Sequence, residues 1–509
     1  MSASGPNMEL TPVPASRTRA TSATESLGRT AARSVGWVVV DRWGTRIASL
    51  LTILVLGRLL TPADFGLVAL AAIFMTFAGI FVEQGFGKAL IQRETLTAKH
   101  SDSAFWASLA MAIVMTAGTI LVAPIVAAAA DAPELAAVLR WLSIGLIINA
   151  LTCTPYALLE RDFKFKTLAI RRLASTVAGG AVGIAMALAG YGVWSLVAQT
   201  LANGIVGLVA LWAATDWRPR TRPSVDALRD LWPIGFGVLG IELLAFFGSQ
   251  ADRMLVAAYL GAQALGWYYM AMKIVMIMIE IFSSVFAAVS LPVFSRLQHD
   301  RSRLSAWLYR LTGASSAITL PCFALAAALA PLLVPWVLGD QWQGSVPIFQ
   351  ILTALGAINA VAYFDRNLLV ATGRAKDALM LTLGQSLLGV ILVLLAAPHG
   401  VLAVAVAVVA RQYLYWPIRI RLLRRAAGIE PARYFAQWIR PFFAAAAMGL
   451  GVAIFVWRWP TLLPSTLAHL SVGAVLGTFI YLAALGVIYP AIYADVRETL
   501  ARVRAPKTA

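Results

Sequence analysis

Long apolar stretches separated by short polar ones run from residue 36 to residue 490. A helix needs about 20 mainly apolar residues to cross the hydrocarbon core of a membrane, and fourteen stretches approach or exceed this length. They are 36–58, 65–88, 104–128, 136–158, 168–189, 192–214, 232–258, 264–292, 308–338, 346–365, 378–397, 400–418, 439–457 and 466–490. The ninth is over-long and has Pro331 and Pro335 near its end, so a re-entrant piece there, and a total of thirteen or fifteen spans, stays open.

Composition agrees with this pattern, because 60% of the residues are hydrophobic and only 13% are charged. These values lie outside the range of soluble globular proteins. We therefore predict an all-α polytopic membrane protein with about fourteen transmembrane helices. Residues 1–35 are rich in small polar residues and arginine and poor in large apolar ones, so we expect a disordered tail there.

The net charge of +17 raises the possibility of a nucleic-acid partner, but its distribution indicates membrane topology instead. Alternate loops, counted from the N-terminal tail, hold 33 of the 41 lysines and arginines, whereas the opposite loops hold only Arg58 and Arg458. Basic loops remain in the cytoplasm, so we expect both termini to be cytoplasmic. The basic run Arg419–Arg425 then serves topology and contact with anionic membrane lipids.

The chain repeats itself weakly at an offset of 200 to 210 residues. LLTPADFGLVAL (59–70) matches YLGAQALGWYYM (259–270), with Gly66 over Gly266, and LLERDFKFK (158–166) matches LLVATGRAK (368–376). Because each repeat has six helices, an even number, both halves enter the membrane in the same direction. In transporters built this way the site usually lies between the halves. The expected parts are an N-terminal six-helix lobe (36–215), a linker (216–231), a pseudo-symmetric C-terminal lobe (232–422), a linker (423–438), two further helices (439–490) and a tail (491–509).

Ionisable residues inside the predicted spans are candidates for function, because charge is costly in hydrocarbon. The basic candidates are Arg42, Arg46, Arg253 and Lys273, and the acidic ones, for ion coupling or gating, are Asp41, Glu83, Glu242, Asp252 and Glu280. For Arg42 and Arg46 the alternative is that the side chains reach the headgroups. For the deeper charges the alternative is a structural ion pair, for instance Arg253 or Lys273 with Glu280.

The repeat places Arg42 opposite Glu242, which suggests that the two side chains face each other across a central cleft and pair in one state only. A cationic cleft suits an anionic ligand, and arginine matches the geometry of phosphate oxygens.

Three sequence features argue against cofactor or metal chemistry. GFGVLG (235–240) fits a dinucleotide fingerprint, but it lies within a predicted span and no strand precedes it. No phosphate-binding G-x-x-x-x-G-K-[ST] loop occurs. The four histidines lack ligand spacing, and we expect them to be solvated. We predict neither a cofactor nor a metal.

An ordered series of segments resembles bacterial polysaccharide exporters of the flippase type, the branch that includes the colanic acid exporter. The series comprises residues 54–106, LLERDFKFK, ADRMLVAAYLGAQALGWYYMAMK (251–273), LPVFSRLQHDRSRL (291–304) and LGDQWQGSVPIFQIL (338–352). The resemblance covers about residues 30 to 425 and weakens over the last two spans.

The resemblance implies two six-helix lobes that rock about a central cavity. The implied cargo is an undecaprenyl-pyrophosphate-linked oligosaccharide, flipped outward across the bacterial inner membrane for polymerisation. It also implies basic residues that hold the pyrophosphate, for which Arg42, Arg46, Arg253 and Lys273 are the candidates, and a sodium or proton gradient as the driving force. Polysaccharide polymerase machinery is an implied partner.

Two rival functions remain. One is a small-molecule exporter of the same fold. The other is a membrane enzyme such as a polysaccharide polymerase or ligase, which we expect to carry acidic or histidine groups on a sizeable outer loop. The predicted outer loops are short, so the transporter is favoured over the enzyme.

Overall fold

The computed structural model describes residues 44–83, 85–93, 95–459 and 464–488, and in this part of the chain every regular element is a helix. Membranes favour helices because all backbone polar groups of a helix are paired internally. The first helix occupies residues 44–59. The others, with two short 3₁₀ turns, are α2 (Pro62–Glu83), α3 (Phe86–Gln92), α4 (Ala98–Ala129), α5 (Glu134–Arg161), α6 (Phe165–Leu188), α7 (Val193–Ala214), α8 (Val225–Leu297), α9 (Arg301–Leu338), α10 (Ser345–Ala371), α11 (Ala375–Ala396), α12 (Val401–Leu414), α13 (Trp416–Ala427), α14 (Pro431–Arg458) and α15 (Thr466–Ile488).

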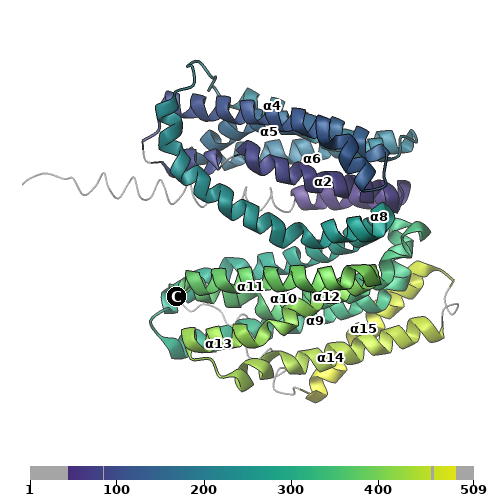
Figure 1. Cartoon of the computed structure of the whole chain (residues 1–509). Coiled ribbons are helices and arrows are strands. Elements are labelled where there is room, and N and C mark those ends of the chain that lie inside the picture. Colours follow the sequence, from purple (N-terminus) through teal and green to yellow (C-terminus); the bar gives the residue numbers. More distant parts are fainter. Residues whose placement is uncertain (1–43, 84, 94, 460–463, 489–509) are drawn as a thin grey trace, which may run out of the picture.

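The helices form two bundles, one with α2 and α4–α7 and the other with α9–α15 (Figure 1). Among the described residues, twelve helices are long and apolar enough to cross a membrane. One of them, α8, is interrupted at Gly261 (φ 79°, ψ −179°) and therefore supplies two of the predicted spans. With the helix at 44–59, each of the fourteen predicted spans has a helical counterpart, and the predicted fold class is confirmed.

Two predicted span ends are wrong, and the re-entrant alternative for the ninth span does not occur. The second span does not continue to residue 88, because α2 ends at Glu83 and α3 begins after Gly85, whose φ of 68° suits glycine. The ninth does not break near Pro331 or Pro335, since α9 stays helical to Leu338. The twelfth ends at Leu414, and the amphipathic α13 follows it.

The weak sequence repeat has a structural counterpart at both positions. α5 ends in a turn whose Phe163 has φ 56°, and α10 ends in the equivalent turn with Gly373 at φ 75°. Gly66 of α2 and Gly266 of α8 pack against each other: a Cβ on Gly66 would lie 3.0 Å from the Gly266 nitrogen, and one on Gly266 would lie 3.2 Å from the Gly66 nitrogen. The two repeated glycines therefore meet between the bundles.

This glycine contact is part of a tight seam at one end of the helices, here called the closed end. The Trp342 indole nitrogen donates to the Gly57 carbonyl at 2.6 Å, and Trp342 is fully buried. The Gln341 side chain also donates to the Gly57 carbonyl at 3.2 Å. Hydrogen bonds between the first helix and the α9–α10 turn thus join the bundles at the closed end.

The opposite end, here called the basic end, carries the Lys- and Arg-rich loops. There, Asp230 near the start of α8 accepts from Arg93 at 3.0 Å and lies 3.5 Å from the His100 ring nitrogen. Further along α8, Gly248 packs on Ser386 of α11, where a Cβ would lie 2.6 Å from the Ser386 hydroxyl. The part of α8 before Gly261 therefore contacts both bundles in turn.

The linker that precedes α8 is held by a buried carboxylate. Asp102 of α4 is 2% exposed, and it accepts hydrogen bonds from the Trp217 indole, from the backbone of Arg220 and Thr221 and from the Thr221 hydroxyl, over 2.7–3.1 Å. These bonds satisfy the charge away from water. They fix residues 217–221 against α4.

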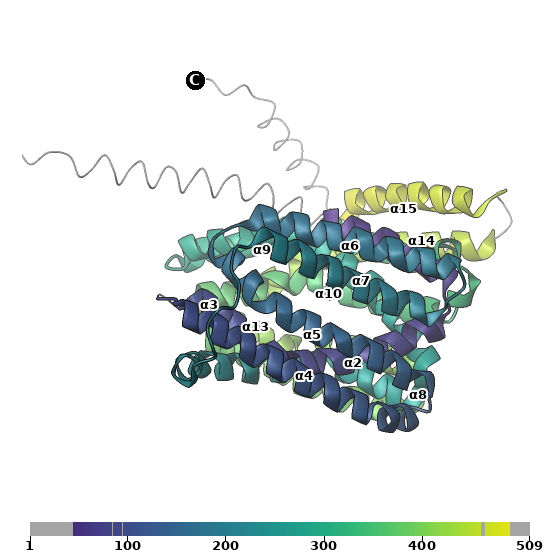
Figure 2. The ribbon, with the colours of Figure 1, turned by 90° about the horizontal axis from the view of Figure 1, so that it is seen from above.

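The last two helices, α14 and α15, follow the two segments in which the sequence repeats. α14 packs on α9, and α15 lies alongside α14 at the margin of the molecule (Figure 2). The Tyr481 hydroxyl of α15 donates to the Ala317 carbonyl of α9 at 2.7 Å. The predicted tails at 1–35 and 491–509 lie outside the described residues.

Candidate functional site

A cavity of about 770 Å³ is lined by α2, α3, α5 and the first half of α8, with one residue each from α6 and α7. Along α5 its wall runs from Leu142 to Glu160. Eighteen residues of helix rise by about 27 Å, which is close to the roughly 30 Å thickness of a membrane core. The cavity therefore provides a path along most of the membrane depth, starting at the basic end.

Charged and amide groups line this path. Lys88 of α3 and Glu242 of α8 form an ion pair at 2.5 Å, and Glu83 of α2 accepts from the Asn149 amide at 3.2 Å. The Arg171 guanidinium of α6 lies over the Tyr156 ring at 5.4 Å. Residues of both signs on several helices thus add polar groups to a wall that is otherwise largely apolar. Hydrated or charged ligands need such groups, because hydrocarbon cannot supply them.

Two smaller cavities adjoin the first and share wall residues with it, among them Thr200. One, of about 240 Å³, lies between the first helix, α2, α6 and α7, and Tyr269 and Lys273 of α8 complete it. The other, of about 420 Å³, lies between α5, α6 and α7. Lys273 thus comes from the second half of the repeat into a space formed mainly by the first half.

Three of the nine predicted residues, Glu83, Glu242 and Lys273, line these cavities. Arg46 and Glu280 join the first helix to α8 through an ion pair at 3.3 Å, so Glu280 pairs with neither Arg253 nor Lys273. Asp41 and Arg42 lie outside the described residues.

Glu242 has Lys88 as its partner. Because Arg42 lies outside the described residues, its suggested pairing with Glu242 stays a prediction.

Arg253 and Asp252 lie nearer the closed end of α8. Arg253 donates to the Gln250 side chain at 3.1 Å and stacks over Tyr269 at 5.6 Å. Asp252 accepts from the buried Tyr268 hydroxyl at 2.5 Å. Arg253 therefore reaches the cavities through Tyr269, which lines the one that contains Lys273.

Sequence reasoning missed Lys88 and Arg171. Both lie at the ends of predicted spans, where they were counted with the loop charges that set topology. The separation of α3 from α2 at Gly85 turns Lys88 toward Glu242, and the pairing of α6 with α5 directs Arg171 to Tyr156. Neither is visible in a linear pattern, because each depends on a neighbouring helix.

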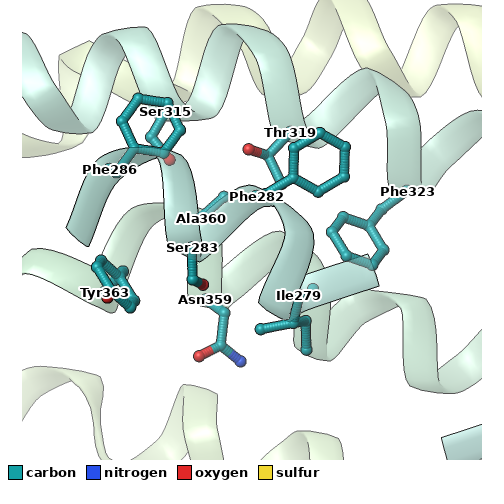
Figure 3. A pocket seen from close by; sticks show the side chains of 11 residues that line it. Ile279, Phe282, Ser283, Phe286, Ser315, Thr319, Phe323, Asn359, Ala360 and Tyr363 are labelled. Atoms are coloured by element: carbon teal, nitrogen blue, oxygen red, sulfur yellow. The ribbon is translucent and has the colours of Figure 1, made fainter. Parts of the chain in front are cut away.

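A separate small cavity lies inside the second bundle, between α8, α9 and α10 (Figure 3). Ser315, Thr319 and Asn359 line it among the rings of Phe282 and Phe323, as Figure 3 shows. Its volume of about 10 Å³ suits roughly one water molecule. It is too small for a substrate.

The histidines are less exposed than expected. His100 and His469 are buried, at 8% and 3% exposure, and His469 lies 2.9 Å from the Trp459 carbonyl. The expectation that all four are solvated is wrong for these two, because neighbouring helix ends supply partners. No cluster of three or more metal-ligating side chains occurs among the described residues.

The fold and the cavities define a polytopic membrane protein of two helical bundles, with charged and amide groups in cavities between the helices of the first bundle and α8. The model of the family described as "Polysaccharide biosynthesis protein" matches residues 55–347, which is more than half of the chain. This chain therefore belongs to that family of polysaccharide biosynthesis proteins, and the predicted family relationship is confirmed.

Two curated relatives support the assignment. The succinoglycan biosynthesis transport protein ExoT of Rhizobium meliloti (strain 1021) is 31% identical over 326 residues, which are 64% of this chain and 66% of that protein. The teichuronic acid biosynthesis protein TuaB of Bacillus subtilis (strain 168) is 24% identical over 427 residues, covering 81% of this chain and 86% of that protein. The chain thus spans just under two thirds of the length of the succinoglycan relative.

Solved structures confirm the fold. The lipid II flippase MurJ in an inward closed conformation superimposes with a TM-score of 0.70 at 14% identity, covering 89% of this chain and 99% of that one. An inward-facing multidrug transporter of the MATE family gives a TM-score of 0.52 at 15% identity, over 79% of this chain and 95% of that chain. At such identities the likeness concerns the arrangement of helices.

Proposed function

We propose that this protein flips an undecaprenyl-pyrophosphate-linked oligosaccharide repeat unit from the cytoplasmic to the outer leaflet of the bacterial inner membrane by alternating access. The product serves synthesis of an exopolysaccharide, capsule or O-antigen type of polymer. Family membership and relatives named for succinoglycan transport and teichuronic acid biosynthesis support a saccharide cargo. The fold shared with a lipid II flippase supports a lipid-linked one.

The observation that carries the proposal is the position of Lys273. It projects from the second half of the repeat into a cavity formed mainly by the first, and within the described residues it has no anionic partner. An uncompensated lysine at membrane depth is costly unless an anion or water accompanies it. A pyrophosphate between the bundles would meet this ammonium group and would be released as the bundles separate.

The cavity geometry suits one half of a transport cycle. The polar path begins at the basic end, and the Gly66–Gly266 contact seals the other end. With basic loops in the cytoplasm, both termini are cytoplasmic and the form seen here receives cargo from inside. The lipid tail remains in the bilayer while the sugars and phosphates enter the path.

Arg46, Arg253 and Arg42 are proposed to assist Lys273 in binding the pyrophosphate. Because Arg46 pairs with Glu280, cargo phosphate would compete with that carboxylate for the same guanidinium. Glu83, Glu242, Asp252, Glu280 and Asp41 are the proposed coupling or gating groups. Lipid-linked oligosaccharide, membrane lipids and polymerase machinery are the proposed partners.

Two alternatives make different predictions. A small-molecule exporter of the same fold would protect cells from toxic compounds without affecting surface polysaccharide. A polymerase or ligase would change the covalent structure of a lipid-linked sugar when the purified protein is incubated with it. The proposed flippase does neither.

The test is export complementation in a bacterium that lacks its own flippase, at matched membrane expression. Wild type should restore surface polysaccharide. Lys273→Ala should abolish export, with lipid-linked intermediates accumulating inside, and Arg46→Ala and Arg253→Ala should reduce it. Arg458→Ala, an exposed arginine at the closed end, is the control and should export normally. Full export by Lys273→Ala would refute the assigned site, and failure of wild type to restore any polymer would refute the function in that host.

A further inference from the structure

Two amide side chains on α7, Gln199 and Asn203, lie four residues apart and therefore on one face of the helix. Both line the cavity that contains Lys273 and also the adjoining cavity between α5, α6 and α7. Neither amide makes a hydrogen bond to another group in the part of the chain that the structure describes. They differ in this from Asn149, which donates to Glu83, and from Gln385, which donates to Gln412.

The position of these amides is set by glycines of α6. A Cβ on Gly183 would lie 2.8 Å from the Gln199 Cβ, and a Cβ on Gly179 would lie 2.8 Å from the Asn203 Cβ. Glycine at both positions lets α6 and α7 approach closely. The stems of both amides therefore pack on the backbone of α6, which gives the GGAVG stretch (179–183) a specific role.

Both amides are partly exposed at the cavity walls, so their donors and acceptors are available to a ligand there. They lie on the same face, one helical turn apart, and are separated along the axis by about 6 Å. Each amide offers both donors and an acceptor. Sugar hydroxyls also donate and accept, so a pyranose ring can pair with both the donors and the acceptor of each amide. A phosphate only accepts, so it would leave the amide acceptors unpaired.

We propose that Gln199 and Asn203 form the sugar-recognition face of the cavity, while Lys273 on the opposing helix holds the pyrophosphate. This inference rests on the proposed function and deepens it. The saccharide would then be bound by α7, in the first half of the repeat. The anion would be bound by α8, in the second half. Specificity for the first sugars of the repeat unit would reside on α7.

The experiment measures binding to purified full-length protein in lipid nanodiscs with two probes. One probe is undecaprenyl pyrophosphate without sugar, and the other is the undecaprenyl-pyrophosphate-linked repeat unit isolated from cells that express this chain. The variants are Gln199→Met and Asn203→Leu, which keep side-chain size and remove the amide, together with Lys273→Ala. Gln350→Met, an exposed amide of α10 outside these cavities, is the matched control.

Each amide variant should bind the sugar-free probe as wild type does and the sugar-linked probe about 2- to 10-fold more weakly, as expected for one neutral hydrogen bond. Lys273→Ala should lose affinity for both probes, and the Gln350 variant for neither. Equal losses on both probes, or no loss on either, would overturn the sugar assignment while leaving the flippase function intact. If the wild-type protein binds neither probe, the proposed function itself is refuted. Each variant must elute from gel filtration and unfold thermally as wild type does for the comparison to count. The variant with both amides replaced is a second test, and it should lose more affinity than either single variant for the sugar-linked probe alone.

Discussion

One methyl group added at Gly66 should shift the equilibrium between two forms of the protein, one in which the closed end is sealed and one in which it is open. Gly66 packs on the first turn of the second half of α8, and a Cβ there would lie 1.7 Å from the Ala262 carbonyl oxygen. Real Cβ atoms essentially never approach another heavy atom within 3.0 Å. Gly66→Ala therefore cannot keep the seam as it is, and α2 and α8 must separate.

The size of the effect follows from the cost of overpacking, which is about 1–3 kcal/mol for an added methyl group in a well-packed contact. The clash involves backbone on both sides, so a side-chain rotation cannot relieve it. The cost applies only to the form in which the seam is closed. The equilibrium should therefore shift toward the open form by roughly 5- to 150-fold.

The assay is the rate at which a membrane-impermeant maleimide, added from the side of the closed end, labels a single cysteine introduced as Val68→Cys in a Cys153→Ser, Cys322→Ser background. Val68 lines two of the cavities, so its labelling reports opening of the seam. Gly118→Ala is the control, because a Cβ at Gly118 of α4 meets nothing within 4 Å. Equal labelling rates for Gly66→Ala and the control, in two folded proteins, would refute this account of the seam.

Three further predictions concern named contacts. Lys88→Gln should lower export by roughly 1.5- to 5-fold, the range for an exposed ion pair, and should cause no further loss in a Glu242→Gln background; additive losses in the double variant would contradict the pairing. Asp102→Ala should reduce the free energy of unfolding by at least about 3 kcal/mol, seen as a lower thermal unfolding temperature in detergent, because it leaves four donors unpaired. Trp342→Phe removes the indole donor of the Gly57 carbonyl, which keeps only the Gln341 amide, at a cost of about 0.5–1.5 kcal/mol, so it should raise maleimide labelling from the closed end; an unchanged rate would show that this bond does not stabilise the seam.

Much of the fold could be read from the linear pattern because the bilayer restricts the alternatives. An apolar stretch of about 20 residues has essentially one way to satisfy its backbone in hydrocarbon, which is to form a helix. The predicted spans 104–128 and 192–214 accordingly became α4 and α7 with ends shifted by a few residues. Errors occurred where local backbone chemistry competes with hydropathy, as at Gly85, where a left-handed conformation ends one helix and starts another.

The candidate site was only partly predictable. Glu83, Glu242 and Lys273 stood out because charge within a span is rare, and all three line the cavities. Lys88 and Arg171 did not, since charges at span ends are expected for topology alone. The amides Gln199 and Asn203 carried no signal of their own, because neutral polar residues occur in many membrane helices.

Helix content and the placement of basic loops depend on short stretches of chain interacting with water and lipid, so the order of residues is sufficient to specify them. The pairing of Arg46 with Glu280 and the contact of Gly66 with Gly266 join residues about 200 positions or more apart. Lys273 is closer in sequence to Gln199 and Asn203, but it too shares a cavity with them only because α8 packs beside the first bundle. Such contacts depend on which helix faces pack together. Packing is decided by how side chains fit across all the helices, which a local sequence pattern does not specify.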